Sequence, residues 1–128
     1  MALERTLSNP TVEVNNDVIG IIPNSTSYKS GKGDKSVRPQ SSGGGSVEMI
    51  VTENAETKKS MVKFSLYNTK TNRDLIRGWQ DQVDGNTIKL SDGSFTESFR
   101  RMIVTSDPEM NLGADGNVEV TFEGAPAV

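Results

Sequence analysis

The sequence contains no cysteine and no histidine among its 128 residues. Without cysteine, a disulfide, a thiolate nucleophile and a zinc–cysteine site are all excluded, and the chain fits a reducing compartment. Without histidine, the commonest general base and the commonest metal ligand are both missing. Any catalytic or metal site would therefore have to be built from carboxylates.

The acidic residues lie in patterns that are typical of turns. Asp84-Gly85, Asp92-Gly93 and Asp107-Pro108-Glu109 all combine an acid with a turn-forming residue. Asp115-Gly116-Asn117 resembles a fragment of a calcium loop, but the remaining ligand spacing is absent. The glycine-rich segments also lack the phosphate-loop pattern. We therefore expect no catalytic residues, no metal site and no cofactor, and we predict that the protein is not an enzyme.

Hydrophobic residues are scarce, at 33% of the chain, and aromatic residues make up only 5%. This length and composition predict one domain over residues 1–128 with a thin core. No apolar run reaches the roughly 20 residues that span a bilayer, and the N-terminus has no signal-peptide hydrophobic region, so we expect no membrane partner. The net charge of −3 does not indicate a nucleic-acid-binding protein.

Alternation of apolar and polar residues predicts about seven or eight strands. They are expected over residues 11–14, 18–22, 25–28, 47–52, 62–67, 87–90, 95–104 and 117–123. The alternation is clearest in the last strand, where Val118, Val120 and Phe122 should face the core. In residues 95–104 the alternation changes phase, and this predicts a β-bulge near Arg100-Arg101.

The strand over residues 47–52 is also expected to have a buried face. Val47, Met49 and Val51 alternate with more polar residues, so they should face the core together. The polar segment 53–59 then suits the end of a hairpin that leads into the strand at 62–67.

Residues 72–83 form the one predicted helix. Asn72 or Thr71 can cap its first turn, and Gly78 weakens it by about 1 kcal/mol relative to alanine. That cost indicates that something packs closely beside Gly78. The apolar stripe of the helix consists of Leu75, Ile76, Trp79 and Val83. We expect the first three of these side chains to anchor the helix to the sheet.

Residues 29–45 are predicted to form a long loop. The segment has five glycines, one proline and a single apolar residue, Val37, so it cannot bury enough surface to offset its ordering entropy. Loops of this length are usually disordered or functional, and both a flexible linker and a subunit contact remain open. Its basic residues are Lys29, Lys32, Lys35 and Arg38.

Together these elements predict a mainly β fold. We expect a β-sandwich or a partly closed β-barrel with one flanking α-helix and a long glycine-rich loop.

Residues 43–124 resemble the inner tail tube proteins of contractile-tailed bacteriophages. The resemblance lies in the order of two long strands, a short helix with Trp79, a hairpin, an Asp-Pro-Glu turn and a final alternating strand. Its motifs are Gly43-Gly44-Gly45-Ser46-Val47-Glu48, Lys63-Phe64-Ser65-Leu66-Tyr67-Asn68-Thr69, residues 104–116, and Val118-Glu119-Val120-Thr121-Phe122-Glu123-Gly124.

The resemblance implies a structural virion protein that assembles as stacked homohexameric rings. In such a tube the subunit sheets join into one β-barrel around a lumen, through which the tape-measure protein and, during genome ejection, the DNA pass. A tail sheath protein surrounds the tube. The chain would then be found in the virion tail, and in the host cytoplasm during assembly.

Two groups of residues gain a role from this resemblance. The basic residues of the predicted loop become candidates for ring stacking or subunit contact. Acidic side chains that face away from the core become candidates for the lumen wall, because like charge would repel DNA phosphates. These lumen-facing candidates are Glu48, Glu97, Glu119 and Glu123.

Two alternatives remain open at the level of sequence. A tube initiator, a baseplate hub protein or a secretion-system tube protein would share the same fold. A small nucleic-acid-binding β-barrel that uses the basic loop is less favoured, and salt-dependent DNA affinity would indicate it.

Overall fold

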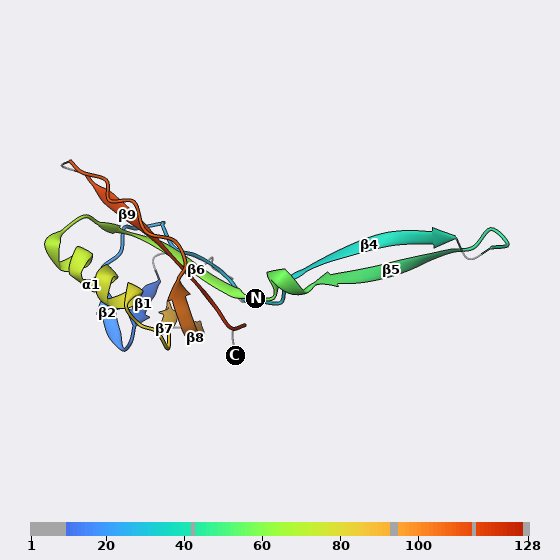
Figure 1. Cartoon of the computed structure of the whole chain (residues 1–128), viewed down its shortest axis with the longest axis horizontal. Helices are drawn as coiled ribbons and strands as arrows, with labels where there is room; N and C mark the ends of the chain where they lie inside the picture. The colour runs from blue at the N-terminus through green and yellow to red at the C-terminus, as the bar shows by residue number, and fades with distance from the viewer. Residues whose placement is uncertain (1–9, 42, 93–94, 114, 127–128) are drawn as a thin grey trace, which may run out of the picture.

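The computed structural model describes residues 10–41, 43–92, 95–113 and 115–126 (Figure 1). The fold is mainly β with one α-helix, as predicted. Seven strands form one sheet in the order β2-β1-β7-β8-β9-β6-β3, and β4 pairs with β5 in a separate two-stranded sheet. The elements are β1 (Thr11–Val14), β2 (Asp17–Ile19), β3 (Ser27–Lys29), β4 (Asp34–Ser41), β5 (Val47–Asn54), the 3₁₀-helix η1 (Ala55–Thr57), β6 (Ser60–Tyr67), α1 (Lys70–Gln80), β7 (Asn86–Ser91), β8 (Thr96–Val104) and β9 (Asn117–Gly124).

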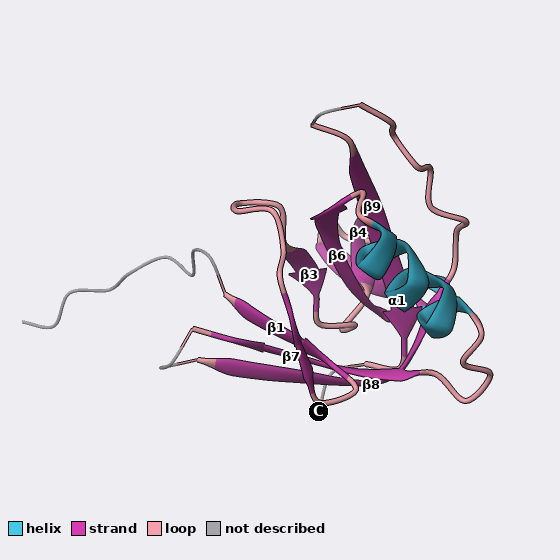
Figure 2. Ribbon diagram, turned by 90° about the vertical axis from the view of Figure 1, so that its left-hand side faces the viewer, coloured by secondary structure: helices cyan, strands magenta, loops and turns pink. Residues whose placement is uncertain are grey.

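The seven-stranded sheet folds over on itself to make a β-sandwich. Figure 2 shows β1, β7 and β8 in one layer and β3, β6 and β9 in the other. The two layers are joined where the end of β8 pairs with β9, through Ile103 opposite Glu123 and Val104 opposite Phe122. The predicted sandwich with one flanking helix is therefore confirmed.

A β-bulge in β8 lies next to the point where the sheet changes layer. Asn86 pairs with Met102 and Ile88 pairs with Phe99, so one residue of β7 faces two residues of β8. The second of these two, Arg101, has a φ of 54°. A bulge bends its strand and increases the local twist, which suits a strand that passes from one layer to the other. The bulge predicted at Arg100-Arg101 is confirmed.

The core lies between the two layers. On β9, Val118, Val120 and Phe122 are fully buried, as their alternation predicted. Their partners on β6 are Leu66, Phe64 and Val62 respectively, and these are fully buried too. The opposite layer contributes Val12, Val14, Ile88, Leu90, Phe99 and Met102.

Helix α1 covers one side of this core. Ile76 is fully buried, Trp79 is 5% exposed, and Leu75 is half-buried against the same cluster. The Trp79 ring lies 6.1 Å from the Phe64 ring and 5.7 Å from the Phe122 ring, measured between centroids. The predicted anchoring of the helix to the sheet is confirmed.

The bounds of the helix differ from those predicted. Thr69 is the N-cap, and its hydroxyl oxygen accepts a hydrogen bond from the backbone N–H of Asn72 at 3.2 Å. The helix ends at Gln80, three residues before the predicted end. Val83 lies beyond the helix and is 91% exposed, so its assignment to the buried stripe was wrong. The apolar spacing continues to Val83, but Asp81 already caps the helix.

One buried polar side chain ties three elements together. The Asn86 Nδ2 donates hydrogen bonds to the carbonyl oxygens of Trp79 and Met102, each at 3.1 Å. Its Oδ1 accepts a hydrogen bond from Asn15 Nδ2 at 3.0 Å. Asn86 therefore fixes the end of α1 and the β1–β2 turn against β8.

Candidate assembly interface

Strands β4 and β5 form a hairpin that projects away from the sandwich (Figure 1). We call this hairpin, residues 34–54, the arm. Its register runs without interruption from Asp34 opposite Asn54 to Ser41 opposite Val47. The predicted loop over residues 29–45 is therefore wrong for residues 34–41. The apolar periodicity that reveals most strands is missing from β4 because both of its faces are exposed.

The two faces of the arm differ in polarity. Residues opposite each other on antiparallel strands share a face. One face pairs Val37 with Val51 and Pro39 with Met49, and it ends at Val47. We call it the apolar face. The polar face carries Ser36, Arg38, Gln40, Glu48, Ile50 and Thr52.

The apolar face has no cover from the described part of the chain. Val47 and Met49 are each 65% exposed, Val51 is 58% exposed, and Val37 is 57% exposed. The prediction that Val47, Met49 and Val51 face the core is therefore wrong. Their alternation is real, but β5 pairs with β4 instead of with β6.

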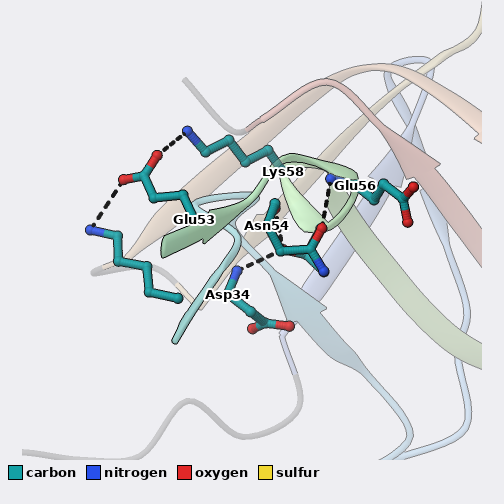
Figure 3. A network of polar contacts seen from close by, with 7 residues as sticks. Asp34, Glu53, Asn54, Glu56 and Lys58 are labelled. Carbon is teal, nitrogen blue, oxygen red and sulfur yellow. Dashed lines mark hydrogen bonds and ion pairs between the residues drawn. The ribbon is translucent and has the colours of Figure 1, made fainter. Parts of the chain in front are cut away.

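The base of the arm is held by a network of hydrogen bonds (Figure 3). The segment 53–59, predicted to end a hairpin with the strand at 62–67, instead contains the end of β5 and the 3₁₀-helix η1. Asn54 caps η1, and its side chain accepts a hydrogen bond from the Glu56 N–H at 3.1 Å. The Thr57 hydroxyl donates to the Asn54 carbonyl oxygen at 2.8 Å and accepts from the Asp34 N–H at 2.7 Å. These bonds join both strands of the arm to η1 and so fix how the arm leaves the sandwich.

An ion cluster adds to this network. Glu53 lies 2.6 Å from Lys58 Nζ and 3.6 Å from Lys35 Nζ, measured to its carboxylate oxygens (Figure 3). The hydrogen bond and the positive charge of Lys58, together with the charge of Lys35, lower the pKa of the Glu53 carboxyl. The cluster therefore bridges β4, β5 and the residue that follows η1.

The tip of the arm is built from glycine. Gly43, Gly44 and Gly45 have φ values of 81°, 61° and 84°, all in the left-handed region that other residues rarely adopt. The Ser46 N–H donates to the Gly43 carbonyl oxygen at 3.2 Å and so closes the turn. The glycine-rich composition that suggested a loop therefore belongs to the tip of a hairpin.

The structure separates the basic residues that were expected to share one loop. Lys29 ends β3, and with Lys32 it lines an open pocket of about 460 Å³ at the base of the arm. Asp34 and Glu123 line the same pocket, so its charge is mixed. Lys35 pairs with Glu53, and Arg38 lies on the polar face. These four residues form no single basic patch that would favour phosphate binding.

The acidic candidates for the lumen also lie apart. Glu119 and Glu123 face away from the core on β9, as predicted, 3.7 Å from Lys63 Nζ and 2.7 Å from Lys59 Nζ respectively. Glu48 lies far along the chain from them, on the polar face of the arm. Their exposure to a lumen stays a prediction.

Glu97 differs from the other three acids. It pairs with the buried Leu90, so it lies on the core side of β8, where it is half-buried. There, burial and the charge of Glu97 raise the pKa of the Tyr28 hydroxyl. The expectation that Glu97 faces away from the core is wrong, because it shares the parity of Phe99 on the same side of the bulge.

The two edges of the seven-stranded sheet are short. The edge strands are β2 and β3, each of three residues, and neither has a further partner in the described part of the chain. Short edge strands reduce unwanted pairing, but each still offers backbone groups to a strand from another subunit.

Nothing in the described residues forms a group of three or more acidic side chains that could hold a metal ion. Across the same residues, no helix has the length and apolar character needed to cross a membrane. Compared with protein-family models, curated proteins and solved structures, the chain gives no match. Among the described residues, the arm and the two sheet edges leave apolar side chains or backbone groups without a partner.

Proposed function

We propose that this protein is a structural subunit that assembles with copies of itself, as the subunits of the inner tube of a contractile phage tail do. The observation that carries the proposal is the arm. An isolated two-stranded hairpin is marginally stable in water, and this one exposes a continuous row of apolar side chains. Both features are explained if a neighbouring subunit covers the apolar face.

The sheet edges support the same proposal. In a ring, the edge at β2 of one subunit can pair with the edge at β3 of the next, which would join the sheets into one continuous barrel. The proposed assembly is a stack of hexameric rings, with the arm contributing to ring stacking. The sheath protein would lie outside the tube, and the tape-measure protein and DNA would pass through it.

A structural role also agrees with the chemistry of the chain. We propose that it is not an enzyme, because it has neither histidine nor cysteine and the carboxylates of Glu53, Glu119 and Glu123 form ion pairs with lysines. Copy number in purified particles would separate a tube subunit from a tube initiator or hub protein, since a tube subunit is far more abundant.

A matched pair of variants tests the role of the arm. Val51→Asp places a charge on the apolar face, and Thr52→Asp places the same charge on the polar face one residue further along β5. Both sites are exposed, so both variants should fold. We expect Val51→Asp to remain monomeric in sedimentation velocity at concentrations where the parent and Thr52→Asp assemble. Equal assembly of the two variants would contradict the proposal that the apolar face is an interface.

A further inference from the structure

A second apolar surface lies on the exposed side of helix α1. Leu75, Gly78 and Trp79 form an open hollow of about 400 Å³, together with Thr71, Asp74 and Gln82. We call it the helix hollow. Its apolar lining comes from Leu75, which is half-buried, and from Trp79, which is 5% exposed.

Gly78 keeps the helix hollow open. A Cβ atom added at Gly78 would meet no atom within 4 Å, so the expectation that the described chain itself packs closely there is wrong. Glycine inside a helix nevertheless costs about 1 kcal/mol relative to alanine. Neither the conformation nor the packing of this subunit requires glycine at this position, whereas a neighbouring molecule that fills the hollow would require it.

The arm and the helix hollow cannot meet within one subunit. The arm extends from one end of the molecule and α1 lies at the other (Figure 1). A contact between them therefore joins two copies through different surfaces. Such a head-to-tail contact propagates into a ring or a filament, whereas a contact between two identical surfaces closes as a dimer.

The size of the apolar face also favours this arrangement. The exposed fractions of its four large side chains correspond to roughly 400 Å² of apolar surface, enough to mark an interaction site. A stable interface of standard size buries about 800 Å² on each partner, and one contact through the apolar face supplies about half of that whichever surface receives it. Two arms packed face to face would give each subunit one such contact, whereas a head-to-tail assembly gives each subunit two, one through its own arm and one through the arm that it receives.

We propose that the apolar face of one subunit docks in the helix hollow of a second copy, with the Met49 side chain over Gly78. This inference rests on the proposed self-assembly and names the surface that receives the arm. Met49 is the longest and most flexible side chain of the apolar face, and methionine adapts well to irregular apolar hollows.

Cysteine cross-linking tests the contact directly, because the chain has no cysteine of its own. Protein with Met49→Cys is mixed with protein carrying Gln82→Cys and a size tag, under conditions of assembly, and treated with a short bismaleimide. We expect a strong mixed cross-link. The control replaces Met49→Cys by Glu48→Cys, on the opposite face of the same strand, and should give a much lower yield.

The possible outcomes test the docking contact and the proposed function independently of each other. Rings or tubes without the mixed cross-link, or with Met49→Cys linked only to itself, would overturn the docking and leave the proposed function standing. The mixed cross-link without rings or tubes would support the docking and count against the tube. Absence of both would overturn both.

Filling the helix hollow gives a second test. Gly78→Gln should raise the concentration of half-assembly about tenfold, equivalent to about 1.4 kcal/mol. Arg77→Gln, at the exposed neighbouring position outside the hollow, should leave that concentration unchanged. Glutamine is a good helix former, so neither variant should lower the melting temperature of the monomer. Unchanged assembly of Gly78→Gln would contradict the docking.

Discussion

At the scale of single residues, Asn86 holds parts of the structure that the hydrophobic core alone does not fix. Its side-chain amide donates hydrogen bonds to α1 and β8 and accepts one from the β1–β2 turn. Sequence reasoning missed this residue, because a lone asparagine at the start of a strand has the appearance of an ordinary turn residue.

Replacing Asn86 by alanine should lower the free energy of unfolding by about 2–3 kcal/mol, since buried carbonyl oxygens lose their donors. Urea denaturation of the monomer would measure the change. Thr87→Ala, at the adjacent exposed position, is the control and should change stability little. A loss below about 1 kcal/mol for Asn86→Ala would show that water replaces the side chain without penalty.

Replacing Gly85 and Gly78 by alanine should change the stability of the fold in opposite directions. Gly85 has a φ of 89°, and a Cβ there would lie 2.6 Å from the Arg101 Cα at the bulge, so Gly85→Ala should destabilise the fold by at least about 1–3 kcal/mol. Gly78 is helical with open space beside it, so Gly78→Ala should stabilise the monomer by about 1 kcal/mol. Thermal unfolding of both variants checks the pair. A stabilising Gly85→Ala would contradict the packing described for the bulge.

At the scale of elements, the strands and the helix that could be predicted from the sequence are those with one buried face. Strands β6 and β9 and helix α1 were predicted because one face of each packs on the core, and burial imposes the alternation that sequence reasoning detects. The bulge was predicted for the same reason, as a change of phase. The alternation in β5 was also recognised, but it gave the wrong partner, because alternation in the sequence does not show whether the apolar side of a strand packs on the core.

Strand β4 could not be predicted in this way. Its hydrogen bonds to β5 stabilise it, and no face of it is buried, so Asp34–Ser41 has no apolar period.

The acidic candidates for the lumen show a related limit of sequence-based prediction. Alternation placed Glu119 and Glu123 outward correctly, but which outward surface faces a lumen depends on contacts between subunits.

Helix α1 should lose its attachment if Trp79 is truncated. The ring is 5% exposed and lies between α1 and the Phe64 and Phe122 rings, so Trp79→Ala should cost about 3–5 kcal/mol of stability. Chemical denaturation followed by far-ultraviolet circular dichroism would measure it. Arg77→Ala, on the exposed side of the same helix, is the control. A cost below about 1 kcal/mol would mean that the ring serves an interface instead of the core.

At the scale of the whole molecule, a small sandwich carries a projecting arm (Figure 1). The sandwich has a core of its own, and the arm adds an apolar surface that the described part of the chain leaves uncovered. The arm at one end and the helix hollow at the other give the subunit two different ends, which is the requirement for a ring or a tube.

Negative-stain electron microscopy of the purified protein, over a range of concentrations, tests this central claim most directly. We expect rings or hollow tubes with a central lumen for the parent chain, and we expect Val51→Asp to form neither. A uniform population of monomers at high concentration, with no rings or tubes on the grid, would contradict it.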